Sequence, residues 1–539
     1  GHCYRLYSSS LYARHMDAFA LPEILTRPLE DVLLAMKALN VSHVSKFPFP
    51  TPPDRSQVNG ALKLLSSLGC VDMSDVEAEG GDGHVTKLGQ AVAKLPLGVR
   101  YAKMLLVAAH AGVLDYAIVV VSILSESSPF HHASLEEDKD EDEKEDGDDD
   151  SLDAVDRLQE EKQTLAKKRE SLRRWSHKHG DIMAAMLAVG AFTYAGRGAG
   201  GQSEKLAGKR FCEENGLDYV IMTRIQKMRS HLASLAKNRL TAAGGVAATT
   251  GGFVSNMKPP SKSEEMYLVQ SIVSGLLDNV ALLAPPGSMS GEHPFGLRSA
   301  YLSSSAAIKQ PLFIDRNSTV YSRDFRQLPQ FVCYDSVISK TTRDGAPVVM
   351  MKNVTPLESN WLGDLAKGSD IVSLGKPLSS PPPTYDADKD AIVCSVLTKY
   401  GSRGWEIPPV KRVMSEILSR TETKRGADFL ADDSFRWFAK FLLEGKVIPE
   451  LEPLKDLFSD NPSVITQRRP LFKVTMLVTA LTEARVDSAF ALKKHWAEKD
   501  DKFLFKALKH WVKKEHHSTA KSIWIKTVKK SIKSWKSES

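Results

Sequence analysis

The sequence has few cysteines and no long apolar segment. Its 539 residues include only five cysteines, which are scattered and form no C-x-x-C pair. This spacing excludes a disulfide framework and a zinc finger, and it fits a reducing, intracellular compartment. The best apolar run, residues 117–124 (AIVVVSIL), falls far short of the ~18 residues that a membrane-spanning helix needs. The first residues also lack the apolar stretch of a signal peptide.

Motifs of nucleotide hydrolysis and of common hydrolases are absent as well. The sequence contains no G-x-x-x-x-G-K-[ST] phosphate loop, no G-x-S-x-G and no H-E-x-x-H. Pro377 follows Gly375-Lys376, where a phosphate loop needs a hydroxyl. We therefore predict no catalytic residue and no metal site in this chain. Three close histidine pairs adjoin charged segments and are expected to be exposed to solvent rather than to bind metal: His131-His132, His177 with His179, and His516-His517.

Charge is small in total but strongly segregated. The formal net charge is only +6. Residues 136–150 contain 12 acidic residues against 2 lysines, whereas residues 491–539 contain 14 lysines against 5 acidic residues. Blocks of this kind are usually interaction segments or disordered segments. The acidic block is either a solvated insert or a mimic of phosphate that competes for the basic block.

The spacing of apolar residues predicts a multidomain, mainly α protein with a small β-barrel. Apolar residues make up 42% of the chain, and its length allows three to four domains. Helices around 29–39 and 54–68 are expected, the second with a capping box of Asp54 and Gln57. A Gly-rich hairpin and a helix from Thr86 follow, and together they predict a winged helix over 25–97; a generic small helical domain is the alternative.

The rest of the chain divides into three further regions. Residues 98–128 and 176–240 have dense helical patterns, and the acidic block and a charged helix at 151–175 separate them. A helix over 264–284 precedes short alternating segments, which predict the small β-barrel. A stiff Ser-Pro linker at 379–383 leads into a mainly helical C-terminal region.

The lysine-rich end of the chain is the positive signal for a partner. Lysines release counterions from phosphates, and aromatic side chains stack on unpaired bases. Trp496, Phe503, Leu504 and Trp511 have helical spacing and are predicted to be core residues, which leaves the lysines as a basic solvent face. The candidates for RNA binding on this face are Lys513, Lys514, Lys529 and Lys530.

Several short stretches, in order, resemble DEAH-box RNA helicases. Residues 1–7 (GHCYRLY) resemble the strand after the arginine-finger motif, and this and the missing initial Met lead us to expect a fragment of a longer protein. Residues 436–445 (RWFAKFLLEG) resemble the nucleolar helicase branch of the small-subunit processome, which also has an acidic insert. The other matching stretches are 47–53 (FPFPTPP), 61–65 (ALKLL), 86–89 (TKLG), 95–97 (LPL) with 100–104, 211–215 (FCEEN), 225–229 (IQKMR), 328–332 (LPQFV) and 361–362 (WL).

The resemblance implies a domain order. It assigns residues 1–24 to the end of the second RecA-like lobe, 25–97 to the winged helix, and 98–260 to the helicase-associated ratchet domain with an acidic insert at 134–150. Residues 261–378 would form an OB-fold, and 379–539 a C-terminal extension with a Lys-rich tail. The sequence departs from the family at Val99, His231 and Arg316-Asn317, where Pro, Gln and His-Pro are usual.

The resemblance also implies a function. ATP and Mg²⁺ would bind upstream of Gly1, in the intact parent, so this chain alone would lack ATPase activity. Its RNA partners would be pre-ribosomal RNA and small nucleolar RNA, and its protein partner a G-patch or processome activator, in the nucleolus and not at a membrane. Arg100, Lys103, Lys227 and Arg229 are candidates for contacts with RNA in the channel, with plain helix-surface charge as the alternative. A splicing-type helicase and a non-catalytic RNA-binding adaptor remain alternative functions.

Overall fold

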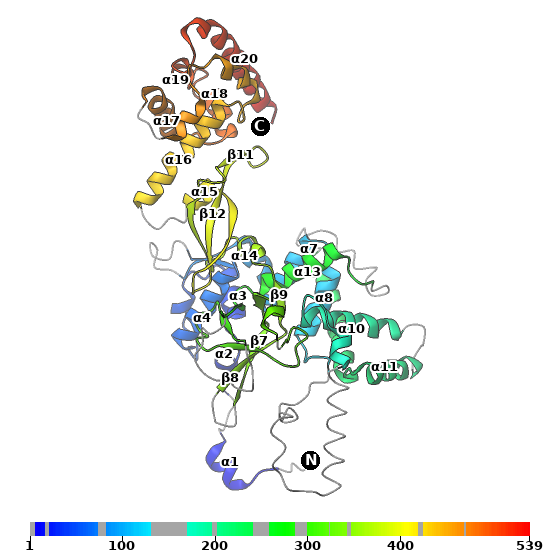
Figure 1. The fold of residues 1–539 in the computed structure, drawn as a ribbon. Helices are drawn as coiled ribbons and strands as arrows, with labels where there is room; N and C mark the ends of the chain where they lie inside the picture. Colours follow the sequence, from blue (N-terminus) through cyan, green and yellow to red (C-terminus); the bar gives the residue numbers. More distant parts are fainter. Residues whose placement is uncertain are drawn as a thin grey trace. The chain divides into compact units, whose positions relative to one another are not determined.

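The chain forms two units in a computed structural model (Figure 1). Unit 1 comprises Gly1–Val372 and Tyr400–Trp405, and unit 2 comprises Ser373–Lys399 and Glu406–Ser539. The structure describes residues 6–16, 21–73, 82–130, 170–196, 202–240, 258–285, 299–322, 324–341, 347–418, 424–467 and 471–538. The acidic block, residues 1–5, His131-His132 and most of the charged helix at 151–175 lie outside the described residues.

Unit 1 begins with short helices and a hairpin. Helices α1 (Ser9–His15), α2 (Glu23–Thr26), α3 (Glu30–Ala38) and α4 (Arg55–Ser67) precede β1 (Val71–Asp72), which pairs antiparallel with β2 (His84–Val85) before α6 (Lys87–Ala93). The apolar face of α4 is buried. Its N-cap, Asp54, accepts a hydrogen bond from the backbone N–H of Ser56, so the capping box with Gln57 is wrong in detail.

A group of longer helices continues unit 1. They are α7 (Val99–His110), α8 (Leu114–Leu124), α10 (Asp181–Ala195), α11 (Gln202–Asn215), α12 (Tyr219–Leu240) and α13 (Lys262–Gly275). The capping box of Ser261 and Glu264 begins α13. This helix ends at Gly275, nine residues before the predicted end, because the chain turns there into β3 (Val280–Leu283). A Cβ on Gly275 would lie 2.7 Å from the carbonyl oxygen of Arg100, so α13 packs closely on α7 at this point.

Seven strands form one open sheet in unit 1. Their order is β7-β8-β5-β4-β3-β6-β9, and all neighbours are antiparallel except β5 and β8. The predicted closed barrel is therefore wrong for the described residues: β7, at one end of the order, exposes Ser336–Ser339 and has only β8 as a neighbour. The remaining strands are β4 (Tyr301–Ser303), β5 (Leu312–Ile314), β6 (Phe331–Cys333), β7 (Ser336–Thr341), β8 (Pro347–Lys352) and β9 (Thr355–Leu357), followed by α14 (Ser359–Leu365).

A buried carboxylate joins the sheet to the helices. Asp181, at the start of α10, accepts hydrogen bonds from the backbone N–H groups of Thr319 at 2.7 Å and Val354 at 2.8 Å, and from the Ser318 hydroxyl. Gly180 immediately before it has φ +84°, and a Cβ there would lie 2.2 Å from the carbonyl oxygen of Val354. Only glycine therefore fits this junction without displacing the sheet.

Unit 2 begins with four strands that were not predicted from the sequence. The strands β10 (Val372–Pro377), β11 (Thr384–Asp386), β12 (Ala391–Tyr400) and β13 (Trp405–Val413) form a sheet in which β12 pairs with the other three. The β-branched run of β12 was a sufficient signal for a strand. The C-terminal region is therefore mixed α/β rather than mainly helical from residue 379.

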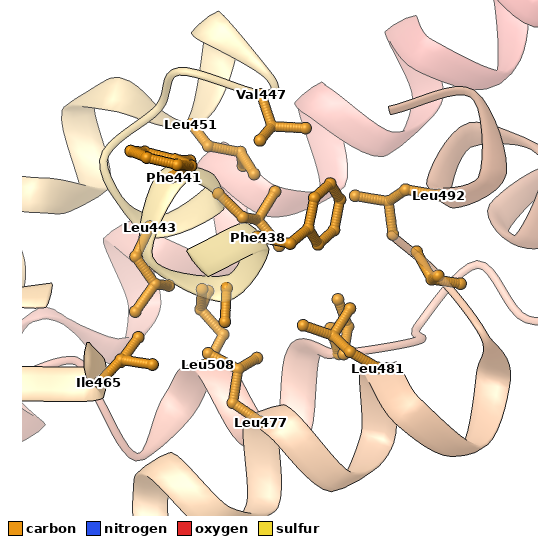
Figure 2. Close-up of a cluster of buried hydrophobic side chains, with 14 of the residues drawn as sticks. Phe438, Phe441, Leu443, Val447, Leu451, Ile465, Leu477, Leu481, Leu492 and Leu508 are labelled. Atoms are coloured by element: carbon orange, nitrogen blue, oxygen red, sulfur yellow. The ribbon is translucent and has the colours of Figure 1, made fainter. Parts of the chain in front are cut away.

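Helices and 3₁₀ segments make up the rest of unit 2. Figure 2 shows the core they share, in which Phe438, Leu477 and Leu508 come from three different helices and are buried. The elements are α15 (Met414–Leu418), α16 (Lys424–Leu443), η4 (Pro449–Leu457), η5 (Pro462–Gln467), α17 (Phe472–Ala484), α18 (Ala489–Glu498), α19 (Phe505–Lys509), η6 (Lys514–His516) and α20 (His517–Glu538).

Candidate nucleic-acid interface

The last helix, α20, separates apolar and basic side chains onto two faces. Its inner face buries Ala520, Trp524 and Val528, at 2–4% exposure, at the spacing of helical turns. Its outer face carries exposed lysines and no carboxylate up to residue 536. We call this outer set the α20 lysine face: Lys521, Lys526, Lys529, Lys530, Lys533 and Lys536.

One member of the α20 lysine face has an acidic partner. Lys530 Nζ lies 2.7 Å from a carboxylate oxygen of Glu450, and the hydrogen bond from Lys530 lowers the pKa of Glu450. Both side chains are at least one third exposed, so this pair contributes little to stability. Within the described part of the chain, the other five lysines form no ion pair. Their charge is therefore available to a partner.

The tryptophans beside these lysines belong to the core. Trp496, Trp511 and Trp524 are at most 2% exposed, and the rings of Trp496 and Trp524 meet edge to face at 5.4 Å. Phe503 is partly buried, and its carbonyl accepts a hydrogen bond from Trp496 Nε1. The prediction that Trp496, Phe503, Leu504 and Trp511 are core residues is confirmed. None of the three tryptophans is available for stacking on bases.

The four lysines predicted from the tail are all exposed. Lys513 and Lys514 lie between α19 and α20, and Lys529 and Lys530 lie on the α20 lysine face. Their binding to RNA stays a prediction. Lys521, Lys526, Lys533 and Lys536 were not predicted, although a helical projection of residues 517–538 places them on the same face.

The cations predicted in unit 1 have mostly internal partners. Arg100 on α7 donates two hydrogen bonds to the carboxylate of Asp278, at 2.5 and 2.7 Å, and one to the carbonyl of Gly275 at 3.2 Å. This bidentate pair joins α7 to the turn after α13. Its geometry is that of a structural ion pair.

Lys103, one turn further along α7, is buried. The residue is only 4% exposed, and its Nζ donates a hydrogen bond to the carbonyl of Leu68 at 2.8 Å. Burial lowers the pKa of Lys103 to about 8. The side chain extends toward the C-terminal end of α4, so Lys103 is not plain helix-surface charge, and its contact with RNA stays a prediction.

Arg229 and Lys227 lie on opposite sides of α12. Arg229 is 4% exposed and donates a hydrogen bond to the Thr193 hydroxyl on α10, whereas Lys227 is exposed. The apolar positions of α12, including Ile225 and Leu232, are on the buried side with Arg229. Of the four unit 1 candidates, Lys227 is therefore the exposed one, and its contact with RNA stays a prediction.

Both histidine pairs within the described residues, His177 with His179 and His516 with His517, are half-buried rather than exposed as predicted. His177 and His179 are 14% and 19% exposed, and both approach the carboxylate of Glu265, at 3.6 and 3.7 Å. Burial lowers the pKa of both imidazoles. In the described ranges no group of three or more His, Cys, Asp or Glu side chains could hold a metal ion. No helix in those ranges is both long and apolar enough to cross a membrane.

Two family models match separate parts of the chain. Residues 99–185 match the family model of the helicase associated domain (HA2), ratchet-like. Residues 450–528 match that of the DEAH helicase DHX37 C-terminal domain, which includes more than half of α20.

Curated helicases match the chain along most of its length. It is 30% identical to the probable ATP-dependent RNA helicase DHX37 of Homo sapiens, over 98% of the chain and 41% of that protein. It is 26% identical to ATP-dependent RNA helicase DEAH13 of Arabidopsis thaliana, over 97% of the chain and 40% of that protein. It is 26% identical to the probable ATP-dependent RNA helicase DHR1 of Saccharomyces cerevisiae, over 76% of the chain and 33% of that protein. The chain thus spans about two fifths of the length of its first relatives. It belongs to the DEAH-box RNA helicases, on the branch of DHX37 and DHR1, and corresponds to their C-terminal half.

Proposed function

We propose that this chain supplies the RNA-binding and partner-binding part of an ATP-dependent RNA helicase in ribosome biogenesis. The observation that carries the proposal is the α20 lysine face, which begins in the region similar to the DHX37 C-terminal domain, with Lys521 and Lys526, and continues past its last matched residue, 528. The helicase would act in the nucleolus on small-subunit ribosomal RNA and release small nucleolar RNA from its precursor. ATP and Mg²⁺ would bind to another part of the same protein, because this sequence contains no phosphate loop.

The proposal assigns a role to each region. Residues 25–97, 98–260 and 261–378 would act as winged helix, ratchet domain and OB-fold, and would form one wall of a channel for single-stranded RNA. The first of these would also receive a G-patch or processome activator. Among these regions, Lys227 in residues 98–260 is the candidate for contact with RNA, because its side chain is exposed. The region from 379 onward would add the basic surface of the tail.

RNA binding by the tail is tested with charge reversals in the 539-residue chain. Changing Lys513, Lys514, Lys529 and Lys530 to Glu should weaken RNA binding. It should also reduce the slope of log affinity against log salt by about 3 to 4, if each lysine neutralises one phosphate. The matched control reverses four exposed lysines on the sheet of unit 2 or its turn: Lys376, Lys389, Lys399 and Lys411. An unchanged slope in the first variant, or equal losses in the two, would contradict the proposed role of the tail.

The cellular role is tested by crosslinking of the full-length protein to RNA. Pre-ribosomal RNA and small nucleolar RNA should be recovered. Recovery of spliceosomal RNAs would support the splicing-type alternative instead. Full-length protein without RNA-stimulated ATP hydrolysis would support the adaptor alternative.

A further inference from the structure

The α20 lysine face has features of a surface for phosphates alone. Its exposed residues other than lysine include Ser518, Ser522 and Ile525, and none of the exposed residues on this face is aromatic. Binding of single strands without sequence preference usually combines a basic groove with aromatic side chains, each worth roughly 1–3 kcal/mol per stacked base. This face can therefore attract a backbone but offers no platform for unpaired bases.

The lysines are held in a fixed row. From Lys521 to Lys536 the helix rises about 22 Å, at ~1.5 Å per residue. The buried side chains of Ala520, Trp524, Thr527 and Val528 anchor the opposite side of the same turns. Since this anchoring fixes the backbone, the lysine side chains start from set positions along the row. A rigid array of phosphates fits such a row better than a flexible strand, which loses conformational entropy on binding.

The charge density of a duplex also favours its binding to this face. A duplex has more charge per unit length than a single strand, so each contact releases more counterions: the slope of log affinity against log salt is about −0.9 per phosphate for a B-form duplex and −0.7 for a single strand. All lysines of the face except Lys530, five in number, lack an ion-pair partner within the described residues. If each of these five lysines neutralises one phosphate, raising the salt from about 50 to 200 mM would lower duplex affinity roughly 500-fold and single-strand affinity roughly 130-fold.

We propose that the α20 lysine face is a docking surface for double-helical RNA, which it recognises by the phosphate backbone and not by base sequence. The inference rests on the proposed RNA-binding role of the tail and adds the class of RNA. Double-stranded RNA is generally recognised through its shape and through backbone contacts, because side chains cannot read its narrow major groove.

The test compares a blunt RNA duplex of mixed sequence with one of its own strands, both bound to the 539-residue chain. Duplex binding should be tighter at low salt and should have the steeper salt dependence. Changing Lys526, Lys529 and Lys533 to Glu should reduce the duplex slope by about 2.7 and change single-strand binding less. The control variant changes Lys376, Lys399 and Lys411, exposed on the sheet of unit 2, to Glu, and it should keep the wild-type slope.

Two exposed phenylalanines of unit 2 provide the opposing test. Phe472 on α17 and Phe490 on α18 are 70% and 63% exposed and could stack on unpaired bases. Changing both to Ala should leave duplex affinity unchanged. The inference is overturned if duplex and single strand bind equally, or if the lysine changes reduce both to the same extent. If neither RNA shows a salt-dependent contribution from the tail, the proposed function of the tail itself fails.

Discussion

The burial of Lys103 predicts an unusual dependence of stability on pH. Its ammonium group is inside unit 1, with Nζ bonded to the Leu68 carbonyl at 2.8 Å, and its pKa is lowered from 10.5 to about 8. Among the described residues, no carboxylate lies within ion-pair distance of Lys103 Nζ. The charged form is therefore destabilised in the folded state by desolvation that the single hydrogen bond does not offset.

The sign and size of the effect follow from the two pKa values. Below pH 8 Lys103 is protonated in both states, and the folded state bears the full cost of the buried charge. A difference of about 2.5 pKa units corresponds to about 3 kcal/mol. Between pH 8 and 10.5 the folded state releases its proton first, so the unfolded state binds more protons and stability rises with pH. We expect the free energy of unfolding to rise by about 2.5 kcal/mol from pH 7 to pH 10 through this group.

The substitution Lys103→Met isolates this contribution. Methionine fills similar space without a charge, so the variant should lose the rise with pH and be at least as stable as the wild type at pH 7. Unfolding in urea, followed by hydrogen exchange of peptides from α7, reports on unit 1 separately. The difference between the two proteins cancels the titration of other groups.

The same variant tests the two roles considered for Lys103. RNA affinity should be unchanged, since the side chain is buried. Parallel pH curves for wild type and variant would refute the buried-charge argument. A loss of RNA affinity with unchanged stability would instead return Lys103 to the RNA channel.

Two further substitutions test the packing of unit 1. Arg100→Lys should lower the free energy of unfolding in urea by about 1–3 kcal/mol, because lysine cannot form both hydrogen bonds to Asp278. It should leave RNA affinity unchanged. A variant that is stable but binds RNA weakly would show that Arg100 contacts RNA. Gly180→Ala should cost about 2 kcal/mol or more, because its Cβ would meet a carbonyl oxygen at 2.2 Å. The control Gly112→Ala shares the positive φ but has no atom within 4 Å of the new Cβ, so it should lower Tm less, and equal losses would disprove a steric cause.

Local patterns predicted much of the helical structure. The apolar spacing of α4 was enough to identify its buried face, and Trp496 and Trp511 were correctly predicted as core, whereas the burial of Trp524 was not predicted. The strand β12 was missed although it contains the run Ala391–Leu397, because the preceding proline tract suggested a linker into helices. The barrel was wrong because short alternating segments predict strands without predicting whether the end strands pair.

The positively charged residues show why the sites were harder to predict than the fold. Arg100 meets Asp278 across 178 residues, Lys103 meets Leu68 across 35, and Arg229 meets Thr193 across 36, so no local pattern reveals their hydrogen-bond partners. The lysines of α20, in contrast, are exposed because the opposite face of the same helix is apolar, which the sequence alone encodes. The candidate cations thus divide into two kinds: Arg100, Lys103 and Arg229 bond internally in unit 1, whereas the lysines of the α20 lysine face other than Lys530 are open to solvent. A change to the first kind should alter stability at constant salt dependence, and a change to the second should alter salt dependence at constant stability. Measuring both quantities on each variant therefore separates structural cations from RNA-binding ones.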